Sequence, residues 1–226
     1  SNPYRRTQTA PAWRWLATRT FAKMVQSVLS VDLPRAADGA SAHGVETLEQ
    51  CSDAELVAAV GRREQHALEE LVRRHGGWAA RFAQRLCGEP QLAEEVVQSA
   101  FLRLWEHPGR WEGRASFPTW FYRVVHNLCI DQLRRTRTNV DPLEESLADP
   151  APTPPELLER RQRGLGVQQA LAQLPQRQRS AIVLSHYEER SQAEAAAILD
   201  ISEGALESLL SRARATLRTL LRDQRH

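Results

Sequence analysis

The stretch SQAEAAAILDISEGALESLLSRARATLR, residues 191–218, constrains the fold more than any other part of the chain. Ser191 and Glu194 have the spacing of a capping box, which starts a helix. Asp200 tolerates the left-handed backbone of a tight turn, and Ser202 can cap a second helix. Apolar residues then recur at helical spacing, namely Leu206, Leu210, Ala213 and Leu217. The pattern predicts a helix-turn-helix, with an ordinary helical hairpin of a bundle as the alternative.

Two polar segments divide the chain. Residues 30–44 are small, polar and contain Gly and Pro, and residues 138–156 contain five prolines among acidic residues. Residues 30–44 are expected to form a flexible connector, and the prolines and acidic residues of 138–156 preclude a continuous helix. Between them, Ser52 begins a second capping box, and apolar side chains recur at helical spacing in residues 65–87, 91–106 and 117–135. No strand-like alternation is present, so the predicted fold class is all-α.

The last of these helices has an unusual polar side. Apolar residues such as Phe121 and Val125 form one face, as expected for a helix in a core. Steps of three and four residues place an aromatic ring, guanidiniums, an amide and a carboxylate on another face: Trp120, Arg123, Asn127, Asp131 and Arg134. For Trp120 and Phe121, an ordinary core position is the alternative to a functional one.

Charge and cysteine usage exclude several classes of site. The net charge is only +2, but the basic segments 114–137 and 204–226 flank an acidic one at 141–160, which suits two separate contacts with a polyanion. The three cysteines lack metal-ligand spacing, which predicts no metal site and a reducing cytoplasm. No apolar run approaches the length of a membrane span. We expect no cofactor. The sequence contains no nucleophile–base pair, phosphate-binding loop or metal cluster that would indicate an enzyme.

Three motifs occur in the order of a known family. They are AEEVVQSAFLRLW at 93–105, FPTWFYRVVHNLCIDQLRR at 117–135, and LAQLPQRQRSAIVLSHYEERSQAEAAAILDISEGALESLLSRARATLR at 171–218, with the acidic Pro-rich linker before the last. Residues 52–222 resemble an ECF-type (group 4) bacterial RNA polymerase sigma factor of the sigma-70 superfamily. The resemblance implies two small helical domains: sigma region 2 at 51–138 and sigma region 4 at 163–226, joined by a linker at 139–162.

The resemblance implies a transcription initiation factor that binds core RNA polymerase, recognises the −10 and −35 promoter elements and assists DNA melting. Helix 117–135 and the loop before it resemble the part of region 2 that captures the −10 element. Melting requires aromatic platforms, edge-reading amides and guanidiniums for phosphates. The predicted −10 residues are Arg114, Phe117, Trp120, Tyr122, Arg123, Asn127, Arg134 and Arg135. His126 stands where the family usually has Arg or another polar residue.

Two further surfaces follow from the same resemblance. Helix 91–106 resembles the one that binds the clamp helices of polymerase, with predicted contacts at Glu94, Glu95, Gln98, Leu102 and Trp105. The alternative is an acidic face that contacts only solvent, with Trp105 partly buried. The second helix of the helix-turn-helix resembles the −35 reader, with predicted contacts at Ser202, Glu203, Glu207, Ser208, Ser211, Arg212 and Arg214. Glu207 and Leu209 stand where relatives commonly carry Arg or Lys.

The implied partners are core RNA polymerase, promoter DNA and an anti-sigma factor, with no small-molecule substrate. The alternative function is a stand-alone helix-turn-helix DNA-binding regulator that acts without joining polymerase.

Residues 1–50 lie outside the family pattern, and the pattern of residues 12–29 predicts a basic amphipathic helix. Three interpretations of that helix remain: an autoregulatory or partner-binding helix, a membrane-surface helix, and a non-native or processed extension.

Overall fold

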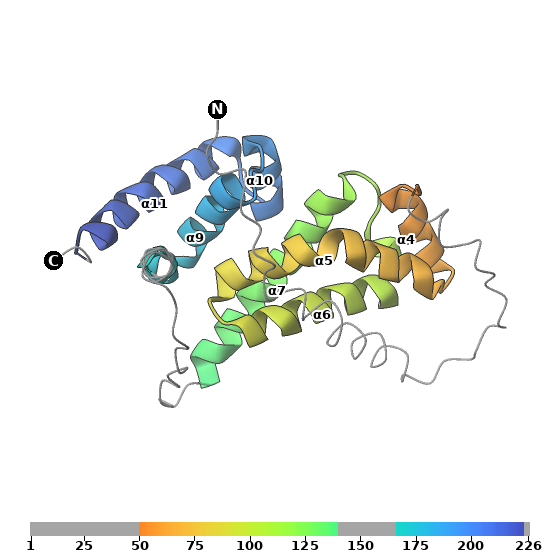
Figure 1. Cartoon of the computed structure of the whole chain (residues 1–226). Helices are drawn as coiled ribbons and strands as arrows, with labels where there is room; N and C mark the ends of the chain where they lie inside the picture. Colours follow the sequence, from red (N-terminus) through yellow and green to blue (C-terminus); the bar gives the residue numbers. More distant parts are fainter. Residues whose placement is uncertain (1–49, 140–165, 224–226) are drawn as a thin grey trace, which may run out of the picture. The chain divides into compact units, whose positions relative to one another are not determined.

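The computed structural model describes residues 50–139 and 166–223, and every regular element in these ranges is helical. The first range contains α4 (Asp53–Gly61), α5 (Gln65–Cys87), α6 (Pro90–Glu106), the short 3₁₀ turn η2 (Pro108–Arg110) and α7 (Phe117–Asn139) (Figure 1). The predicted helices 65–87 and 91–106 match α5 and α6 closely. Helix α7 begins where predicted and extends beyond 135. The all-α fold class is confirmed.

The second range contains a helical turn at 166–173, α9 (Gln176–Ile182), the π-helical segment η3 (Val183–Tyr187), α10 (Gln192–Leu199) and α11 (Glu203–Asp223). Helix α11 packs against both α9 and α10. The predicted helix-turn-helix is therefore present as α10 and α11. Because α9 lies against both helices, the pair belongs to a small bundle rather than standing alone.

The capping and turn chemistry read from the sequence is confirmed atom by atom. Ser52 and Ser191 each accept a hydrogen bond from the backbone N–H three residues later, and the glutamate at that position bonds back to the serine backbone. Asp200 ends α10 in the left-handed conformation, with φ 57° and ψ 47°. The hydroxyl of Ser202 accepts a hydrogen bond from the Ala205 N–H at 3.2 Å, which caps α11.

The described residues form two compact units. The first contains α4, residues of α5 up to Gly77, and residues 101–108. Its fully buried side chains include Leu56, Val60 and Leu71. A buried carboxylate, Glu70, binds Arg73 and Arg74 at 2.6–2.7 Å, and Arg74 also bonds Asp53 at 3.2 Å. These guanidinium bonds lower the pKa of Glu70 and tie α4 to α5.

The second unit contains residues 78–100 and 109–226. An aromatic cluster fills its core: the rings of Trp78 and Tyr122 stack with centroids 3.8 Å apart, and Phe82 meets Tyr122 edge-on at 5.0 Å. Apolar residues of α9, η3, α10 and α11 are also buried, among them Ala181, Leu184, Ile198 and Leu206. Helix α7 contacts α10 within this unit.

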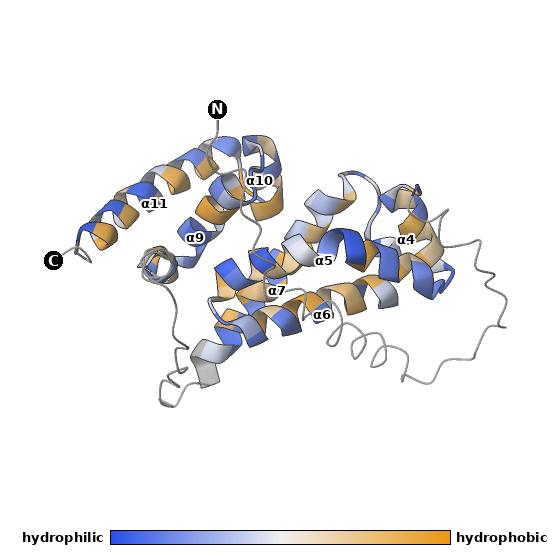
Figure 2. Ribbon diagram, viewed as in Figure 1, coloured by the Kyte–Doolittle hydropathy of each residue, from blue (hydrophilic) through white to orange (hydrophobic). Residues whose placement is uncertain are grey.

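No helix in the described ranges is long and apolar enough to cross a membrane. The predicted amphipathic helix at 12–29, the flexible connector at 30–44 and the linker at 139–162 fall almost entirely outside the described residues. The longer described helices are amphipathic. In α11 the hydrophilic and hydrophobic residues occupy opposite sides of the helix (Figure 2), as expected for a helix with one buried and one solvated face.

Candidate nucleic-acid interface

Helix α7 presents a polar, exposed side opposite its core face. Arg123, Asn127, Arg134 and Arg135 are exposed, whereas Phe121, Val125 and Leu128 are buried. The spacing of three and four residues that predicted this stripe therefore places the amide and the guanidiniums on solvent-facing positions. Arg134 lies 3.5 Å from Asp131, and both side chains are exposed. Breaking such a surface ion pair costs little free energy. This side exposes one amide and several guanidiniums, which are groups that can hydrogen-bond to base edges and phosphates.

The aromatic part of the prediction requires correction. Phe117 and Tyr122 are only 2% exposed, so neither ring offers a surface on which a base can stack. Phe117 stacks on Phe121 with ring centroids 5.4 Å apart, and Trp111 covers it edge-on at 5.8 Å. Trp120 is half-buried and remains the one aromatic side chain of the predicted stripe that reaches the surface. The rings of Phe117 and Tyr122 are placed by packing in the apolar core and not for stacking on bases.

Tyr122 is held by a buried carboxylate that the sequence did not reveal. Its hydroxyl donates a 2.7 Å hydrogen bond to Glu188, and Arg85 of α5 donates another 2.7 Å bond to the same carboxylate. Burial and the Glu188 charge raise the pKa of the Tyr122 hydroxyl, so it stays protonated. Arg190 lies over the Tyr122 ring, 5.0 Å from its centroid. Tyr122 and Glu188 are 66 residues apart, so no local pattern could have paired them.

Other contacts join α7 and the end of α5 to the C-terminal helices of the same unit. Arg179 is buried and donates hydrogen bonds to the carbonyls of Leu86 and Ala172. His126 Nε2 lies 3.0 Å from the Ser180 hydroxyl, and burial lowers the pKa of His126. Arg123 pairs with the exposed Asp200 at 2.9 Å. Part of the predicted −10 side of α7 therefore faces α9 and the turn after α10 in this structure.

The loop before α7 is ordered by its own backbone and side chains. The indole N–H of Trp111 donates to the Ala115 carbonyl at 3.0 Å, and Gly113 has a positive φ of 72° that favours glycine. Ser116 contacts Thr119 at 2.9 Å at the start of α7. Arg114 is almost fully exposed and pairs with Glu112 at 2.8 Å. This loop leaves the Arg114 guanidinium on the surface, as the sequence predicted.

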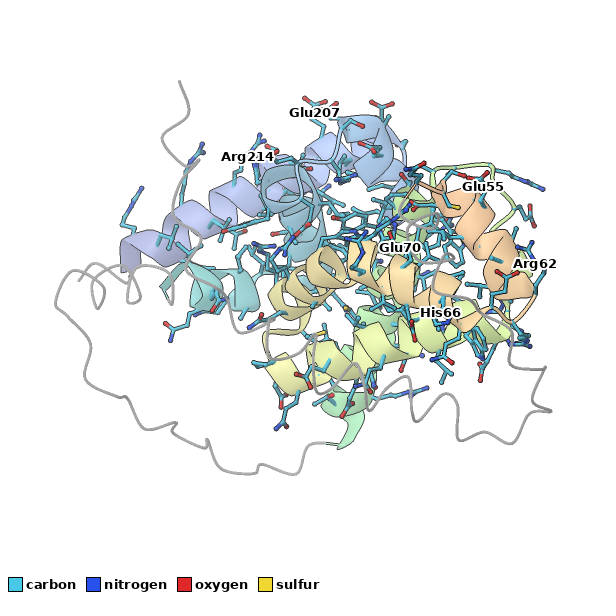
Figure 3. All side chains as sticks on the ribbon, turned by 45° about the vertical axis from the view of Figure 1, so that its right-hand side comes forward. Glu55, Arg62, His66, Glu70, Glu207 and Arg214 are labelled. Carbon is cyan, nitrogen blue, oxygen red and sulfur yellow. The ribbon has the colours of Figure 1, made fainter. Side chains whose placement is uncertain are left out.

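Helix α11 carries a second exposed polar side. All seven predicted −35 residues are exposed: Ser202, Glu203, Glu207, Ser208, Ser211, Arg212 and Arg214. Glu207 and Arg214 project from the outer side of the helix (Figure 3). Leu206, Leu210 and Ala213 are buried against the rest of the unit, whereas Leu209 is half-buried. A solvent-facing side on the second helix of a helix-turn-helix is the arrangement that enters a DNA major groove.

Helix α6 differs from its prediction at one residue. Glu95 is exposed, and Glu94, Gln98 and Leu102 are half-buried and still reach solvent. Trp105, in contrast, is 7% exposed. The Arg63 guanidinium covers its ring at 5.4 Å and donates a 2.7 Å hydrogen bond to its carbonyl. A tryptophan at a helix end can supply apolar area to the core, and that role explains Trp105 in place of docking.

Within the described ranges, no group of three or more His, Cys, Asp or Glu side chains could hold a metal ion. The polar side chains of α7 and α11 are suited to contacts with phosphates and base edges. Arg and Asn are the side chains that make bidentate hydrogen bonds to guanine and adenine.

Comparison with known proteins gives consistent matches. Residues 71–138 match the family described as Sigma-70 region 2, and residues 165–217 match Sigma-70, region 4. SigM of Mycobacterium tuberculosis, an ECF RNA polymerase sigma factor, is 34% identical over 170 residues, which cover 75% of this chain and 85% of SigM. SigL of the same species is 34% identical over 171 residues, which cover 74% of this chain and 96% of SigL.

More distant and structural matches agree. SigW of Bacillus subtilis is 26% identical over 179 residues, covering 74% of this chain and 95% of SigW. The structure of CnrH in complex with the cytosolic domain of CnrY matches with a TM-score of 0.57 at 29% identity, covering 76% of this chain and 97% of CnrH. The sigma factor RpoE of Bartonella quintana, solved with the anti-sigma factor NepR, matches with a TM-score of 0.54 at 26% identity, covering 68% of this chain and 96% of RpoE.

Proposed function

We propose that this chain, which belongs to the ECF family of RNA polymerase sigma factors, reads promoter DNA with the exposed sides of two helices, α7 and α11. It is a transcription initiation factor that directs RNA polymerase to promoters. Region 2 extends over 51–138 and region 4 over 163–226, with 139–162 as the linker. The relatives found are sigma factors, and we propose that this chain likewise acts without catalysis, in the cytoplasm where polymerase and promoters are found.

The observation that carries the proposal is the exposed amide and guanidinium stripe on α7. Asn127 and Arg134 lie on the same side of one helix, and both are solvent-exposed although the opposite side of α7 is core. An exposed amide can read the edge of an unpaired base, and guanidiniums hold the phosphates on either side of it. Trp120 supplies one partly exposed ring beside them. Phe117 and Tyr122 support this side from within the core.

Helix α11 takes the −35 role in the proposal. Arg212 and Arg214 contact DNA, and Ser208 and Ser211 can donate to phosphate or base edges. Glu207 can accept a hydrogen bond from a cytosine N4 amino group, whereas its charge repels nearby phosphates. The −35 contact is therefore selective and weak by itself.

Polymerase binding is assigned to the solvent-facing side of α6, with Glu94, Glu95, Gln98 and Leu102 as the contacts. Trp105 is withdrawn from this set because it is buried under Arg63. Solved relatives of this fold are complexes with the cytosolic domain of CnrY and with the anti-sigma factor NepR. By analogy, we propose that an anti-sigma factor also regulates this chain.

Run-off transcription with core polymerase and a promoter library tests this function. Once a responding promoter is found, Asn127→Ala should reduce the permanganate reactivity of promoter thymines, because the amide that holds an extruded base is lost. Gln84→Ala, at an exposed position on α5, should leave melting unchanged. Equal thymine reactivity for the parent and Asn127→Ala would remove Asn127 from the −10 site.

A matched pair of arginine substitutions on α11 tests the −35 assignment. Arg212→Ala should weaken a promoter that has a −35 element and lower the salt dependence of its binding, because a phosphate or base contact is lost. Arg222→Ala, on the exposed last turn of the same helix, removes the same charge outside the proposed site. If both variants weaken the promoter equally, general charge explains the effect and the −35 assignment fails.

A further inference from the structure

A single carboxylate joins the residues that match region 2 to those that match region 4. Glu188 directly follows η3 and is only 8% exposed. The Tyr122 hydroxyl of α7 donates a 2.7 Å hydrogen bond to one of its oxygens, and the Arg85 guanidinium of α5 donates a 2.7 Å bond to the other. Both donors lie in the region 2 match at 71–138, whereas Glu188 lies in the region 4 match at 165–217. The carboxylate therefore connects two parts of the second unit that are expected to read different promoter elements.

Two contacts between an arginine and an aromatic ring lie next to this carboxylate. The Arg85 guanidinium lies 4.9 Å from the centroid of the Tyr187 ring, and the Arg190 guanidinium lies 5.0 Å from the centroid of the Tyr122 ring. Each region thus places one arginine over a tyrosine of the other. Cation–π contacts of this kind are stronger where water is excluded. Both hydrogen-bond donors of Glu188 therefore have a second partner on the region 4 side.

The same packing occupies part of the proposed −10 side of α7. The Arg123 guanidinium lies 2.9 Å from the carboxylate of Asp200, which ends α10. Nearby on α7, His126 Nε2 lies 3.0 Å from the Ser180 hydroxyl of α9, and α10 contacts α7. The proposed function assigns Arg123 to promoter DNA, where guanidiniums bind phosphates. A promoter phosphate and Asp200 therefore compete for one guanidinium.

The burial of Glu188 makes its contact all-or-none. The Glu188 side chain is 6% exposed and that of Arg85 is 26% exposed. Removing one partner of a buried ion pair leaves the charge of the other without compensation. Separation of the two regions, in contrast, returns both charges to water, which solvates them well. Polar contacts between parts of one chain resemble those of transient complexes, so this set of contacts can hold the regions together and still release them.

The chain between the two regions is long enough for them to separate. The predicted linker, residues 139–162, can span about 3.3–3.6 Å per residue, on the order of 80 Å when extended. Its sequence is rich in proline and acidic residues. Because the linker permits separation, the side-chain contacts decide whether the two regions stay together.

We propose that Glu188 is a latch that holds region 4 against region 2 in the free factor and keeps it in a self-inhibited state. Polymerase, which holds the two regions at separate promoter elements, must break these contacts, and part of its binding free energy is used for this. Promoter DNA then replaces Asp200 at Arg123. The inference rests on the proposed function, because it takes α7 and α11 as the promoter-reading helices. The latch itself can be measured without DNA or polymerase.

Small-angle X-ray scattering of the full chain tests the latch. Glu188→Gln keeps the shape of the side chain and removes its charge, so Arg85 loses its carboxylate and the radius of gyration should increase as the regions separate. Glu189→Gln, at the exposed neighbouring position, removes the same charge and should leave the radius of gyration unchanged. Far-UV circular dichroism checks that each variant keeps its helices. The same radius of gyration for the parent and both variants would show that Glu188 is not a latch.

Arg85→Gln gives the same test from the other side of the ion pair, and it replaces Glu188→Gln if that variant does not fold. Arg85→Gln should also expand the chain. The double variant should expand it no further than either single substitution, because the two residues act through one contact. Additive expansion would mean that Arg85 and Glu188 act separately, which overturns the latch.

Affinity for core polymerase tests the self-inhibition. Glu188→Gln should bind core polymerase about 5- to 150-fold more tightly than the parent, which is the usual size of a conformational coupling. Glu189→Gln should bind as the parent does. An expanded Glu188→Gln chain with parental affinity would overturn the self-inhibition. If neither the parent nor Glu188→Gln binds core polymerase, the proposed function fails, and the scattering comparison by itself still confirms or overturns the latch.

A double-mutant cycle tests the competition for Arg123. Asp200→Asn removes the competing charge and keeps the turn, because asparagine also tolerates the left-handed backbone that Asp200 adopts. Fluorescence anisotropy should show that this variant binds a −10 fragment more tightly than the parent. In an Arg123→Ala background, the same substitution should bring no gain. An equal gain in both backgrounds would show that Asp200 repels DNA in general, and would overturn the competition for Arg123.

Discussion

His126 shows how a single side chain links pH to the packing of this protein. Its Nε2 lies 3.0 Å from the Ser180 hydroxyl and its Nδ1 lies 3.4 Å from the Asn127 amide oxygen. Burial lowers its pKa below the ordinary value of 6.5, although the Asn127 bond partly opposes this. The folded protein therefore favours the neutral ring. No carboxylate among the described contacts of His126 compensates a proton on it.

The sign of the pH effect follows from proton linkage. Well above pH 6.5 the ring is neutral in both the folded and the unfolded chain, and His126 contributes no pH dependence. As pH falls below that value, the unfolded chain binds a proton first, and stability is lost. Each pH unit between the two pKa values costs at most about 1.4 kcal/mol.

We therefore predict that the free energy of unfolding falls as the pH is lowered below 6.5 in the parent and falls less steeply in His126→Gln. Urea denaturation at a series of pH values measures the difference. His107→Gln, at an exposed position, controls for the loss of a histidine. Parallel pH profiles for the parent and His126→Gln would show that burial of this ring has no energetic consequence.

Helix α6 places a buried residue and a proposed polymerase contact within three residues of each other. Trp105 is buried under Arg63, whereas Leu102 is half-buried and reaches solvent. Trp105→Ala should lower the free energy of unfolding by about 3–5 kcal/mol, because it leaves a large cavity. Leu102→Ala should cost much less stability and should weaken binding to core polymerase. Thermal melts and co-purification with core polymerase measure the two effects separately.

Arg103→Ala, on the exposed side of the same helix, is the matched control for polymerase binding. A Leu102→Ala variant that binds core enzyme as tightly as the parent, with Arg103→Ala also unaffected, would remove this side of α6 from the docking surface. A small stability loss for Trp105→Ala would show instead that the indole is not a core residue.

Sequence reasoning succeeded where an element is specified by neighbouring residues. The two capping boxes, the left-handed Asp200 and the apolar spacing in α11 all depend on contacts within a few positions, and all appear in the structure. Local rules of this kind determine where helices begin, end and turn. The polar side of α7 was also readable, because helical periodicity alone separates exposed Asn127 from buried Phe121.

The same reasoning failed where tertiary contacts decide. The family resemblance assigned Phe117 and Tyr122 to the −10 site and Trp105 to the docking surface, but neighbouring rings and the Arg63 guanidinium cover these side chains. The Glu188 carboxylate that holds Tyr122 comes from a segment that carries no local sequence signal for this contact.

The two surfaces proposed to contact DNA, on α7 and α11, carry acidic as well as basic side chains. Glu203 and Glu207 lie among the exposed arginines of α11, and on α7 the exposed Arg123 is paired with Asp200. A surface with few free positive charges neutralises few phosphates, so its affinity for DNA is low at physiological salt. High affinity then requires both surfaces to bind at once, which polymerase can enforce by holding them at promoter spacing.

The isolated chain should therefore bind promoter DNA weakly, with dissociation constants in the range of about 10⁻⁴ to 10⁻⁶ M that is typical of non-specific binding. Addition of core polymerase should produce tight, sequence-specific binding to the same fragment. Fluorescence anisotropy of a labelled promoter and of a scrambled control at several salt concentrations measures both. Glu207→Gln should strengthen binding of the free chain to both fragments alike, because it removes phosphate repulsion without adding sequence contacts. Submicromolar binding of the free chain to the promoter alone would mean that the two surfaces do not need polymerase, and would favour a regulator that acts by itself.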